Sequence, residues 1–243
     1  MFTGTQLRCF GWTCISVLSF AAPEASAQLV SRVSVSAVGR EATQRHLGSN
    51  YYTVALSGDG RFVAFRSTAA QFHPRAGLGD KLYVFDRWSH EIELASVNPV
   101  TGVQLSDAAA PSLSFDGRWV AFHSRDAGLY GGPVTGGAQC YLLDRATGFI
   151  EMLSRGIRNA PGDQPSGFPS ISADGSVVVF GSLASDLVPG DTNRREDVFC
   201  WRRGSSGVVR LSVGANGMEG NLHSNTASVS GDGRYVIYRT GAS

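Results

Sequence analysis

Apolar and polar positions follow one repeating order along this chain. Four segments share it, namely "SGDGRFVAFRS", "SFDGRWVAFHS", "SADGSVVVFGS" and "SGDGRYVIYRT", and their Asp-Gly pairs lie 57, 58 and 58 residues apart, at Asp59, Asp116, Asp174 and Asp232. A short strand of small residues precedes each pair and a bulkier one follows. Because Asp-Gly tolerates the positive φ of a tight turn, each copy predicts a β-hairpin of strands one and two.

The second strand of each copy is apolar at every position: "FVAF", "WVAF", "VVVF" and "YVIY". A strand exposed on one side alternates apolar and polar residues, whereas one covered on both faces does not. The repeat therefore predicts sheets that are packed between other sheets.

A third apolar strand follows in three copies, as "LYVFDR", "CYLLDR" and "VFCWRR", and a fourth, more polar one comes after a short turn, as "IELASV", "IEMLSR" and "VVRLSV". Charged residues are typical of the outer edge of a sheet. The unit is thus a four-stranded antiparallel sheet, and such sheets stacked around an axis form a β-propeller. We expect an all-β fold with three complete repeats and a split partial fourth blade.

The two ends of the repeat region raise the question of closure. "RVSVSAVGRE" from Arg32 matches "RLSVGANGME" from Arg210, so an isolated fourth strand comes first and an isolated hairpin of strands one and two comes last. Residues 33–35 could pair with residues 234–240 and close a small ring, or the arc could stay open and self-associate through its terminal blades. Closure within one chain is favoured, because it carries no association cost.

The motifs "DGRFVAF" and "DGRWVAF", followed by "LYVFDR" and "LLDRATG", resemble the WD-like repeats of the TolB-type β-propeller family over residues 29–243. Members of this kind serve as envelope interaction modules or as accessory domains of hydrolases, and commonly have six or more blades. The resemblance implies a binding or protein-interaction scaffold. The alternatives are a propeller-type hydrolase or lyase, an accessory domain of one, or a truncated propeller without independent activity.

Residues 1–27 have the order of a signal peptide: a cation at Arg8, the apolar stretch "CISVLSFAA", and the small-residue site "ASA" before Gln28. We expect cleavage after Ala27 and a periplasmic or secreted propeller of residues 28–243. A membrane anchor is the competing interpretation, but the apolar run is shorter than the ~20 residues that span a bilayer.

Composition limits the partners. The net charge is +1, and the basic residues, all arginine except Lys81, are scattered along the chain. We therefore expect neither nucleic-acid binding nor stable membrane insertion. Cys140 and Cys200 would remain after cleavage; a disulfide is possible in an oxidising compartment, and two buried thiols are favoured.

Long connections predict where binding occurs. They join strands two and three, over residues 68–80, 125–138 and 183–196, and successive blades, over residues 98–109, 157–167 and 214–225, and all of them lie at one end of an up-and-down sheet. Long loops on a rigid scaffold commonly carry function. We expect a protein, peptide or glycan there, and the candidate binding residues are His46, Asp107, Asp163, Asp191, Asn193 and His223.

Metal and catalytic signals are weak. In "DLVPGDTNRRED", the oxygens of Asp191, Asn193 and Asp197 are spaced as in a calcium loop, but Arg195 occupies the fifth position. His46 and His223 lie in equivalent loops without a third ligand. The sequence contains no nucleophile elbow, zinc-protease motif or phosphate-binding loop, so we predict no metal, cofactor or catalytic residue. An enzyme would have to use carboxylates such as Asp163, Asp186 and Asp191.

Overall fold

The computed structural model describes residues 16–19, 29–32, 54–73, 76, 79–97, 102, 107–126, 136–215 and 217–242. These residues form strands and one 3-10 turn, η1 (Ala70–Phe72). No helix in these residues is long and apolar enough to cross a membrane. Most of these strands form three four-stranded antiparallel sheets, and the other strands form two-stranded sheets. The all-β prediction is confirmed.

Each four-stranded sheet is one blade, and its strands follow chain order across the sheet. Blade one contains β3 (Val54–Leu56), β4 (Phe62–Ser67), β5 (Lys81–Asp86) and β6 (Ile92–Leu94). Blade two contains β7 (Ala109–Leu113), β8 (Trp119–Ser124), β9 (Gln139–Asp144) and β10 (Ile150–Met152). Blade three contains β11 (Ser166–Ile171), β12 (Val177–Ser182), β13 (Asp197–Arg202) and β14 (Val208–Arg210). The terminal hairpin contains β15 (Ser224–Val229) and β16 (Val236–Thr240).

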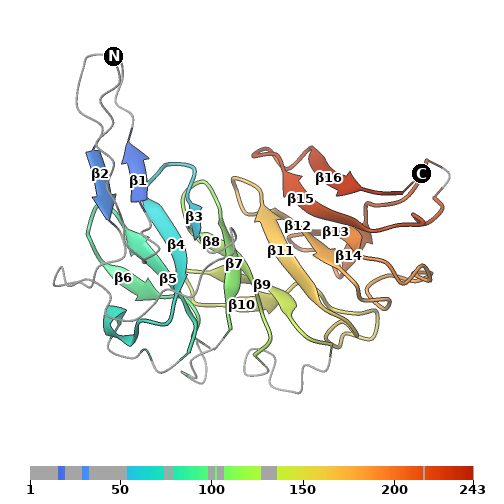
Figure 1. Cartoon of the computed structure of the whole chain (residues 1–243), viewed down its shortest axis with the longest axis horizontal. Coiled ribbons are helices and arrows are strands. Elements are labelled where there is room, and N and C mark those ends of the chain that lie inside the picture. The colour runs from blue at the N-terminus through green and yellow to red at the C-terminus, as the bar shows by residue number, and fades with distance from the viewer. Residues whose placement is uncertain are drawn as a thin grey trace, which may run out of the picture.

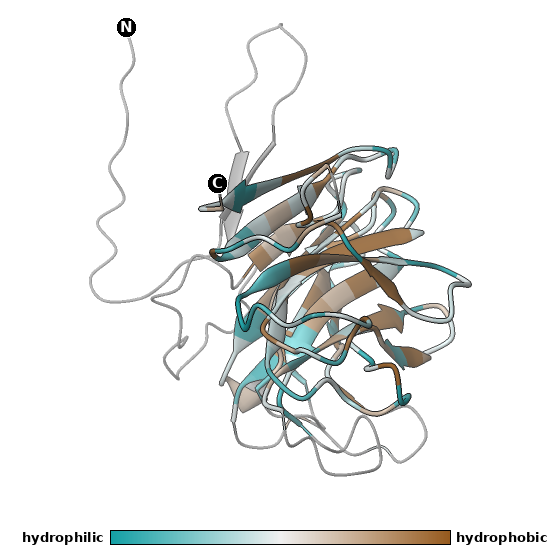
Figure 2. Ribbon diagram, turned by 90° about the vertical axis from the view of Figure 1, so that its right-hand side faces the viewer, coloured by the Kyte–Doolittle hydropathy of each residue, from teal (hydrophilic) through white to brown (hydrophobic). Residues whose placement is uncertain are grey.

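The blades stack side by side in an arc (Figure 1), and the first strands of neighbouring blades are in contact, β3 with β7, β7 with β11 and β11 with β15. Strand one therefore lines the inner side of the arc, as in a β-propeller. The apolar residues lie along the strands and the polar ones mainly in the loops (Figure 2). Core clusters join one blade to the next, so that Ala64 and Val120 share one cluster and Ala121 and Val178 share another.

One hydrogen-bonding pattern builds all four Asp-Gly turns. In blade one, the Ser57 hydroxyl donates to Asp59 Oδ1 over 2.5 Å, and the same oxygen accepts the Arg61 N–H over 2.9 Å. The Ser57 Oγ also accepts the N–H of Phe62, the first residue of β4, over 2.8 Å. Corresponding bonds recur around Asp116, Asp174 and Asp232. A side-chain-stabilised turn of this kind fixes the start of strand two relative to strand one.

The turns are also linked from blade to blade. The backbone N–H of Asp59 donates to the Phe115 carbonyl, Phe115 to Ala173, and Ala173 to Gly231, each over 2.8–2.9 Å. These bonds form a chain along the end of the arc that carries the tight turns. The turns therefore set the spacing of the blades as well as the register within each blade.

The fourth strands are shorter than the sequence pattern predicts, because a serine side chain replaces their last ladder bonds. The hydroxyl oxygens of Ser96, Ser154 and Ser212 accept the N–H of the second residue of strand three, over 3.0–3.1 Å. A longer fourth strand would use its backbone carbonyl for this purpose. As a result, β6, β10 and β14 have three residues each, and the loops between blades begin earlier than expected.

The terminal hairpin is a two-stranded sheet. Among the described residues β16 pairs only with β15, whereas β2 (Leu29–Arg32) pairs with β1 (Ser16–Ser19). The expected partner segment, residues 33–35, lies outside the described residues, as does His46. Cleavage after Ala27 would remove β1, and it stays a prediction.

Cys140 and Cys200 are buried free thiols, as favoured from the sequence. They belong to different core clusters, on opposite sides of blade three. Burial raises the pKa of both thiols.

The close fit at the turns can be tested with two glycines of positive φ. Gly117 has a φ of 66°, and an added Cβ would overlap the Phe62 ring, which Arg145 covers at 4.4 Å. Gly204 has a φ of 81° with no atom within 4 Å of the added Cβ. Gly204→Ala should cost about 1 kcal/mol of unfolding free energy, from backbone strain alone. Gly117→Ala should cost about 1–3 kcal/mol more, because it also overpacks the site. Urea unfolding measures both variants, and equal losses would show that Phe62 does not hold the turn.

Candidate binding site

The inner strands carry a repeated irregularity at the end of the arc where the long loops lie. Strand pairing shifts between Ala109 and Ser112, and at the corresponding positions of β11 and β15. Within each shift one non-glycine residue has a left-handed backbone: Ala110 at φ 49°, Phe168 at 54° and Thr226 at 53°. Such a conformation costs about 1–3 kcal/mol, so its presence in three repeats marks a built feature of the fold.

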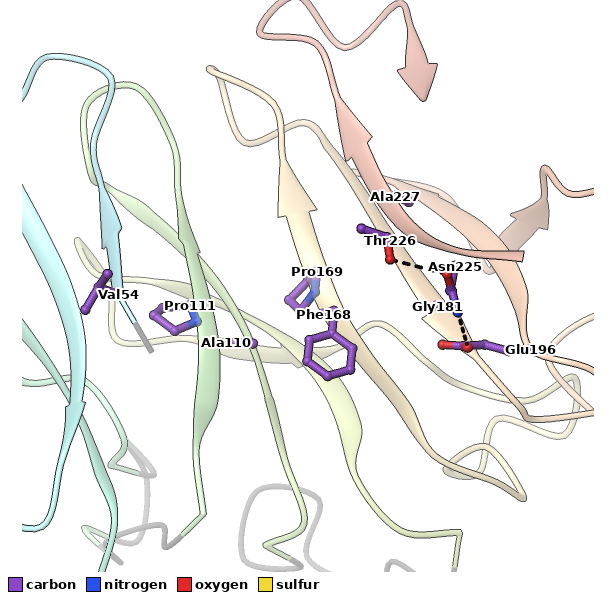
Figure 3. A pocket seen from close by; sticks show the side chains of 10 residues that line it. All are labelled: Val54, Ala110, Pro111, Phe168, Pro169, Gly181, Glu196, Asn225, Thr226 and Ala227. Carbon is purple, nitrogen blue, oxygen red and sulfur yellow. Dashed lines mark hydrogen bonds between the residues drawn. The ribbon is translucent and has the colours of Figure 1, made fainter. Parts of the chain in front are cut away.

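These bulges line a cavity of about 380 Å³ on the inner side of the arc. The bulge residues contribute to its wall together with Val54, Pro111, Pro169 and Ala227, which occupy one and the same position in the four first strands. Figure 3 shows Phe168 and Pro169 between the side chains of β3 and β7 on one side and those of β15 on the other. Phe168 is 47% exposed, so a ligand in the cavity can contact it.

Two prolines suit the position of strand one. Pro111 and Pro169 lie within β7 and β11, where a proline would break the ladder of a central strand. The first strand is instead the inner edge of its blade, and proline there removes an N–H that would otherwise point into the cavity without a partner. At these two points the cavity wall therefore has an apolar side chain and no backbone N–H donor.

The polar part of the wall lies on the side of the terminal hairpin. Asn225 Nδ2 donates to Glu196 Oε2 over 3.0 Å, and Thr226 Oγ1 donates to Asn225 Oδ1 over 3.3 Å (Figure 3). The Glu196 backbone N–H donates to His223 Nδ1 over 2.9 Å, which ties the start of β13 to the loop before β15. Gly181 leaves room for this carboxylate, because an added Cβ would lie 2.8 Å from Glu196 Oε1. Glu196 is the one ionisable side chain among the ten lining residues.

His123 supports the bulge of the neighbouring blade. Its Nδ1 accepts the backbone N–H of Phe168 over 3.3 Å, and its ring meets the Phe168 ring edge-on, with centroids 5.4 Å apart. The pKa of His123 is lowered to about 4, mainly by burial; the Asp107 charge opposes this shift, and the charges of Arg66 and Arg125 contribute to it. The imidazole is therefore neutral at pH 7 and can accept this hydrogen bond.

Two of the sequence candidates lie near the rim of the cavity. Asp107 and His223 precede β7 and β15 at equivalent positions. Asp107 forms ion pairs with Arg66 at 3.5 Å and with Arg125 at 3.6 Å, so it links blade one to blade two. His223 positions Glu196 through its backbone. Both residues hold parts of the site together, and neither lines the cavity.

Asp191 and Asn193 belong to a buried ionic cluster in blade three. Arg210 Nη1 lies 2.6 Å from Glu219, 3.2 Å from Asp191 and 3.6 Å from Asp197. The Asn193 amide nitrogen donates to Asp197 and to the Gly220 carbonyl, over 2.9 and 3.1 Å. The oxygens that are spaced as in a calcium loop are thus bound by a guanidinium and an amide, and no group of three metal-ligating residues occurs among the described residues.

Asp163 also has a structural role. Its carboxylate accepts the backbone N–H and the hydroxyl of Ser185, over 2.8 and 2.7 Å, and its own N–H donates to Asp186 Oδ1 over 3.0 Å. Burial raises the pKa of Asp186, and the neighbouring Asp163 charge adds to the effect. These bonds join the loop before β11 to the loop after β12.

The cavity lies at the long-loop end of the arc, where the sequence predicts binding, but Phe168, Glu196 and Asn225, which line it, are not among the candidates named from the sequence. A signal was present in "PSLS" and "PSIS", since a proline 58 residues after another at the same strand position identifies an edge strand. The residue types alanine and threonine do not predict the left-handed conformation of Ala110 and Thr226.

No family model and no curated protein matches this chain. Among solved structures, it is similar to TolB from Acinetobacter baumannii, with a TM-score of 0.49, 18% identity, and coverage of 79% of this chain and 38% of that one. A putative TolB from Agrobacterium tumefaciens has a TM-score of 0.46 and 20% identity, and the match covers 93% of this chain and 70% of that one. The tricorn protease has a TM-score of 0.48 and 14% identity, and the match covers 87% of this chain and 17% of that one. The chain thus spans well under half of two of these proteins. TolB, which the repeat resembles, is among the similar structures, and the blade assignment itself stands on the strand order and stacking described above.

Because Arg210 is the cation of the ionic cluster, its substitution should lower the free energy of unfolding by an amount that depends on pH. Arg210→Met leaves Asp191 and Asp197 buried without a counter-charge, which should destabilise the fold by about 3–5 kcal/mol at pH 7.5. Burial raises the pKa of Asp191 to about 6, so the folded state keeps a proton that the unfolded chain releases, and ionisation of Asp191 weakens the fold as the pH rises through 6. The variant should therefore lose less stability at pH 5 than at pH 7.5, in urea unfolding.

Arg158→Met, which removes an exposed arginine, is the control and should change stability by less than about 0.5 kcal/mol. A pH-independent loss in the Arg210 variant would contradict the role assigned to the cluster.

His123 predicts the opposite pH dependence. Its pKa is about 4 in the folded protein and about 6.5 in an unfolded chain, so the unfolded state binds the proton first as the pH falls. The wild type should therefore lose about 2 kcal/mol of stability between pH 6.5 and 4 relative to His123→Gln, which keeps an acceptor for the Phe168 N–H and does not titrate. Parallel pH profiles of the two proteins in urea unfolding would overturn this prediction.

Proposed function

We propose that this chain is an exported binding protein, periplasmic or secreted, that holds a polypeptide segment in the cavity on the inner side of the arc. The observation that carries the proposal is the three-fold recurrence of a strained bulge at the cavity wall. Backbone strain persists where the surrounding structure enforces it, and it concentrates at binding and catalytic sites. Ala110, Phe168 and Thr226 supply that strain in β7, β11 and β15.

The wall favours a ligand with apolar side chains. Six of its ten residues present only hydrocarbon, namely Val54, Ala110, Pro111, Phe168, Pro169 and Ala227. Ligand sites commonly combine such a wall with a few fixed polar groups. A glycan would need more hydrogen-bonding side chains than Glu196, Asn225 and Thr226 provide, so a peptide fits the wall better.

Glu196 favours a basic group on that peptide. Its carboxylate is oriented by Asn225, and its backbone is held by His223, so it does not have to reorganise when a ligand enters. None of the described residues that line the cavity carries a positive charge. A guanidinium or ammonium beside Glu196 would form a charge-assisted hydrogen bond, which is about twice as strong as a neutral one.

The test is titration calorimetry with acetyl-Leu-Arg-Leu-amide, acetyl-Leu-Glu-Leu-amide and chitotetraose. The arginine peptide should bind and the glutamate peptide should not. Glu196→Gln should weaken binding of the arginine peptide about tenfold, because it keeps the shape of the side chain and removes its charge. Phe168→Ala should weaken binding of the same peptide, because it removes apolar contact.

Glu91→Gln is the matched control, since Glu91 is an exposed carboxylate at a tight turn, at the other end of the sheet. The Glu91→Gln variant should bind the arginine peptide with the same affinity as the wild type. Equal binding of the two peptides, or binding of chitotetraose alone, would refute the proposal.

A further inference from the structure

The imidazole of His123 lies between blade two and the wall of the cavity. It extends from β8 to β11, where its Nδ1 accepts the Phe168 N–H over 3.3 Å and its ring meets the Phe168 ring edge-on. An added Cβ at Gly167 would lie 3.0 Å from the same nitrogen, so the glycine allows β11 to approach the imidazole this closely. One side chain of blade two therefore contacts both the backbone and the ring of a cavity residue in blade three.

This contact requires the neutral imidazole. A neutral histidine has one ring nitrogen that donates a hydrogen bond and one that accepts, whereas both nitrogens of the imidazolium donate. Because Nδ1 accepts the Phe168 N–H, the proton of the neutral ring is on Nε2. A second proton, on Nδ1, would place two N–H groups against each other. The hydrogen bond between His123 and Phe168 is therefore lost when the ring becomes charged.

The charged groups around His123 come from three segments. Burial is the largest effect that disfavours the imidazolium; Asp107, before β7, favours it, and Arg66 in β4 and Arg125 after β8 disfavour it. Cys140 is opposite His123 on β9, and burial raises the pKa of its thiol, which is therefore neutral. The strands β7 and β11 contain no titratable residue. Among the described residues, Asp107 is thus the anion whose charge acts on the ring.

Two arrangements of the ring follow from these surroundings. The neutral ring accepts from Phe168, as in the structure. The imidazolium has no acceptor for that N–H and is attracted to Asp107, whose carboxylate already lies 3.5 Å from Arg66 and 3.6 Å from Arg125. Phe168 then loses a contact that supports its left-handed backbone, at a φ of 54°. A non-glycine residue keeps such a conformation only where its surroundings enforce it.

We propose that His123 is a pH-sensitive switch of the cavity: its protonation releases the bulge at Phe168 and lowers the affinity of the cavity for its peptide. This inference rests on the proposed function, because it concerns the regulation of the same cavity. Phe168 lines the cavity wall (Figure 3), so a shift of its ring removes apolar contact with the ligand. Conversely, a ligand that packs on Phe168 favours the neutral ring, so its binding lowers the pKa of His123.

The first measurement needs no ligand. NMR spectra of the chain of residues 1–243, with 15N-labelled histidine and phenylalanine, follow the His123 ring and the Phe168 amide from pH 7 to pH 3.5. Because the pKa of His123 is lowered to about 4, both signals should change together with a midpoint near pH 4. In His123→Asn, whose Oδ1 takes the place of Nδ1 and does not titrate, the Phe168 amide should lose this transition.

The amide of Phe180, in the core cluster of blade three, is the internal control and should not follow His123. His123→Gln, which also keeps an acceptor, is the second variant should His123→Asn not fold, and circular dichroism at each pH shows which proteins are folded. A Phe168 amide that does not respond to protonation of His123, or that responds equally in the variant, would overturn the proposal.

The second measurement is titration calorimetry with acetyl-Leu-Arg-Leu-amide at pH 7 and pH 3.5, on the wild type and on His123→Asn. Any effect of pH on Glu196 occurs in both proteins and cancels in the ratio of their dissociation constants. About a quarter of a histidine with a pKa of about 4 is neutral at pH 3.5, so the wild type should lose about fourfold in affinity relative to the variant between the two pH values.

A ratio of dissociation constants that does not change with pH would overturn the proposal, even where the Phe168 amide follows His123. Absence of binding by both proteins at pH 7 would instead refute the proposed function, and with it the effect on affinity. The NMR titration distinguishes the two failures, because it reports the coupling of His123 to Phe168 without any peptide.

Discussion

A carboxylate at each Asp-Gly turn sets the geometry on which the rest of this structure depends. Asp174 illustrates it: hydrogen bonds from the Ser176 N–H and the Ser172 and Ser176 hydroxyls lower its pKa to about 2. The turn is therefore held by an ionised group at any ordinary pH. Because side chains alternate between the two faces of a strand, a slip of one residue at the turn would turn every buried residue of strand two to the opposite face. The turn thus determines which residues face each neighbouring blade.

Regularity at the turns permits irregularity at the other end of the sheets. The tight turns hold the blades together through backbone bonds such as Asp59 to Phe115. At the long-loop end, backbone bonds such as Ser166 to Ala138 are accompanied by side-chain contacts that differ from blade to blade. Arg66 bridges Asp80 and Asp107, His123 supports Phe168, and Glu196 binds Asn225. The side chains at the long-loop end can vary without loss of the fold, because the register is already fixed elsewhere. A common scaffold can in this way carry a specific binding surface.

The fold was predictable because it depends on local patterns that recur. Asp-Gly and the uninterrupted apolar runs located the hairpins, and the expected loops between strands two and three, residues 183–196 among them, agree with the structure. The ends of the fourth strands were wrong, since the effect of Ser96 or Ser154 depends on a hydrogen bond to another strand. The residues that line the cavity could not be predicted for the same reason. Asp191 has the appearance of a metal ligand until Arg210, 19 residues later in the chain, is placed beside it.

The same dependence on distant partners makes the departures between repeats informative. A residue that appears in every blade, such as the turn aspartate, reports what any blade needs in order to fold. A residue that varies together with its partner reports which strand belongs beside which: Arg61 and Arg118 face aspartates, and where Ser176 stands instead, the third strand ends in Arg202. In a stack of similar strands, backbone hydrogen bonds cannot distinguish one partner from another, so the distinction has to come from such pairs. In the part of the chain that the structure describes, β16 pairs only with β15, so Arg234 has no aspartate opposite it and Tyr238 has no ring stacked on it from a third strand.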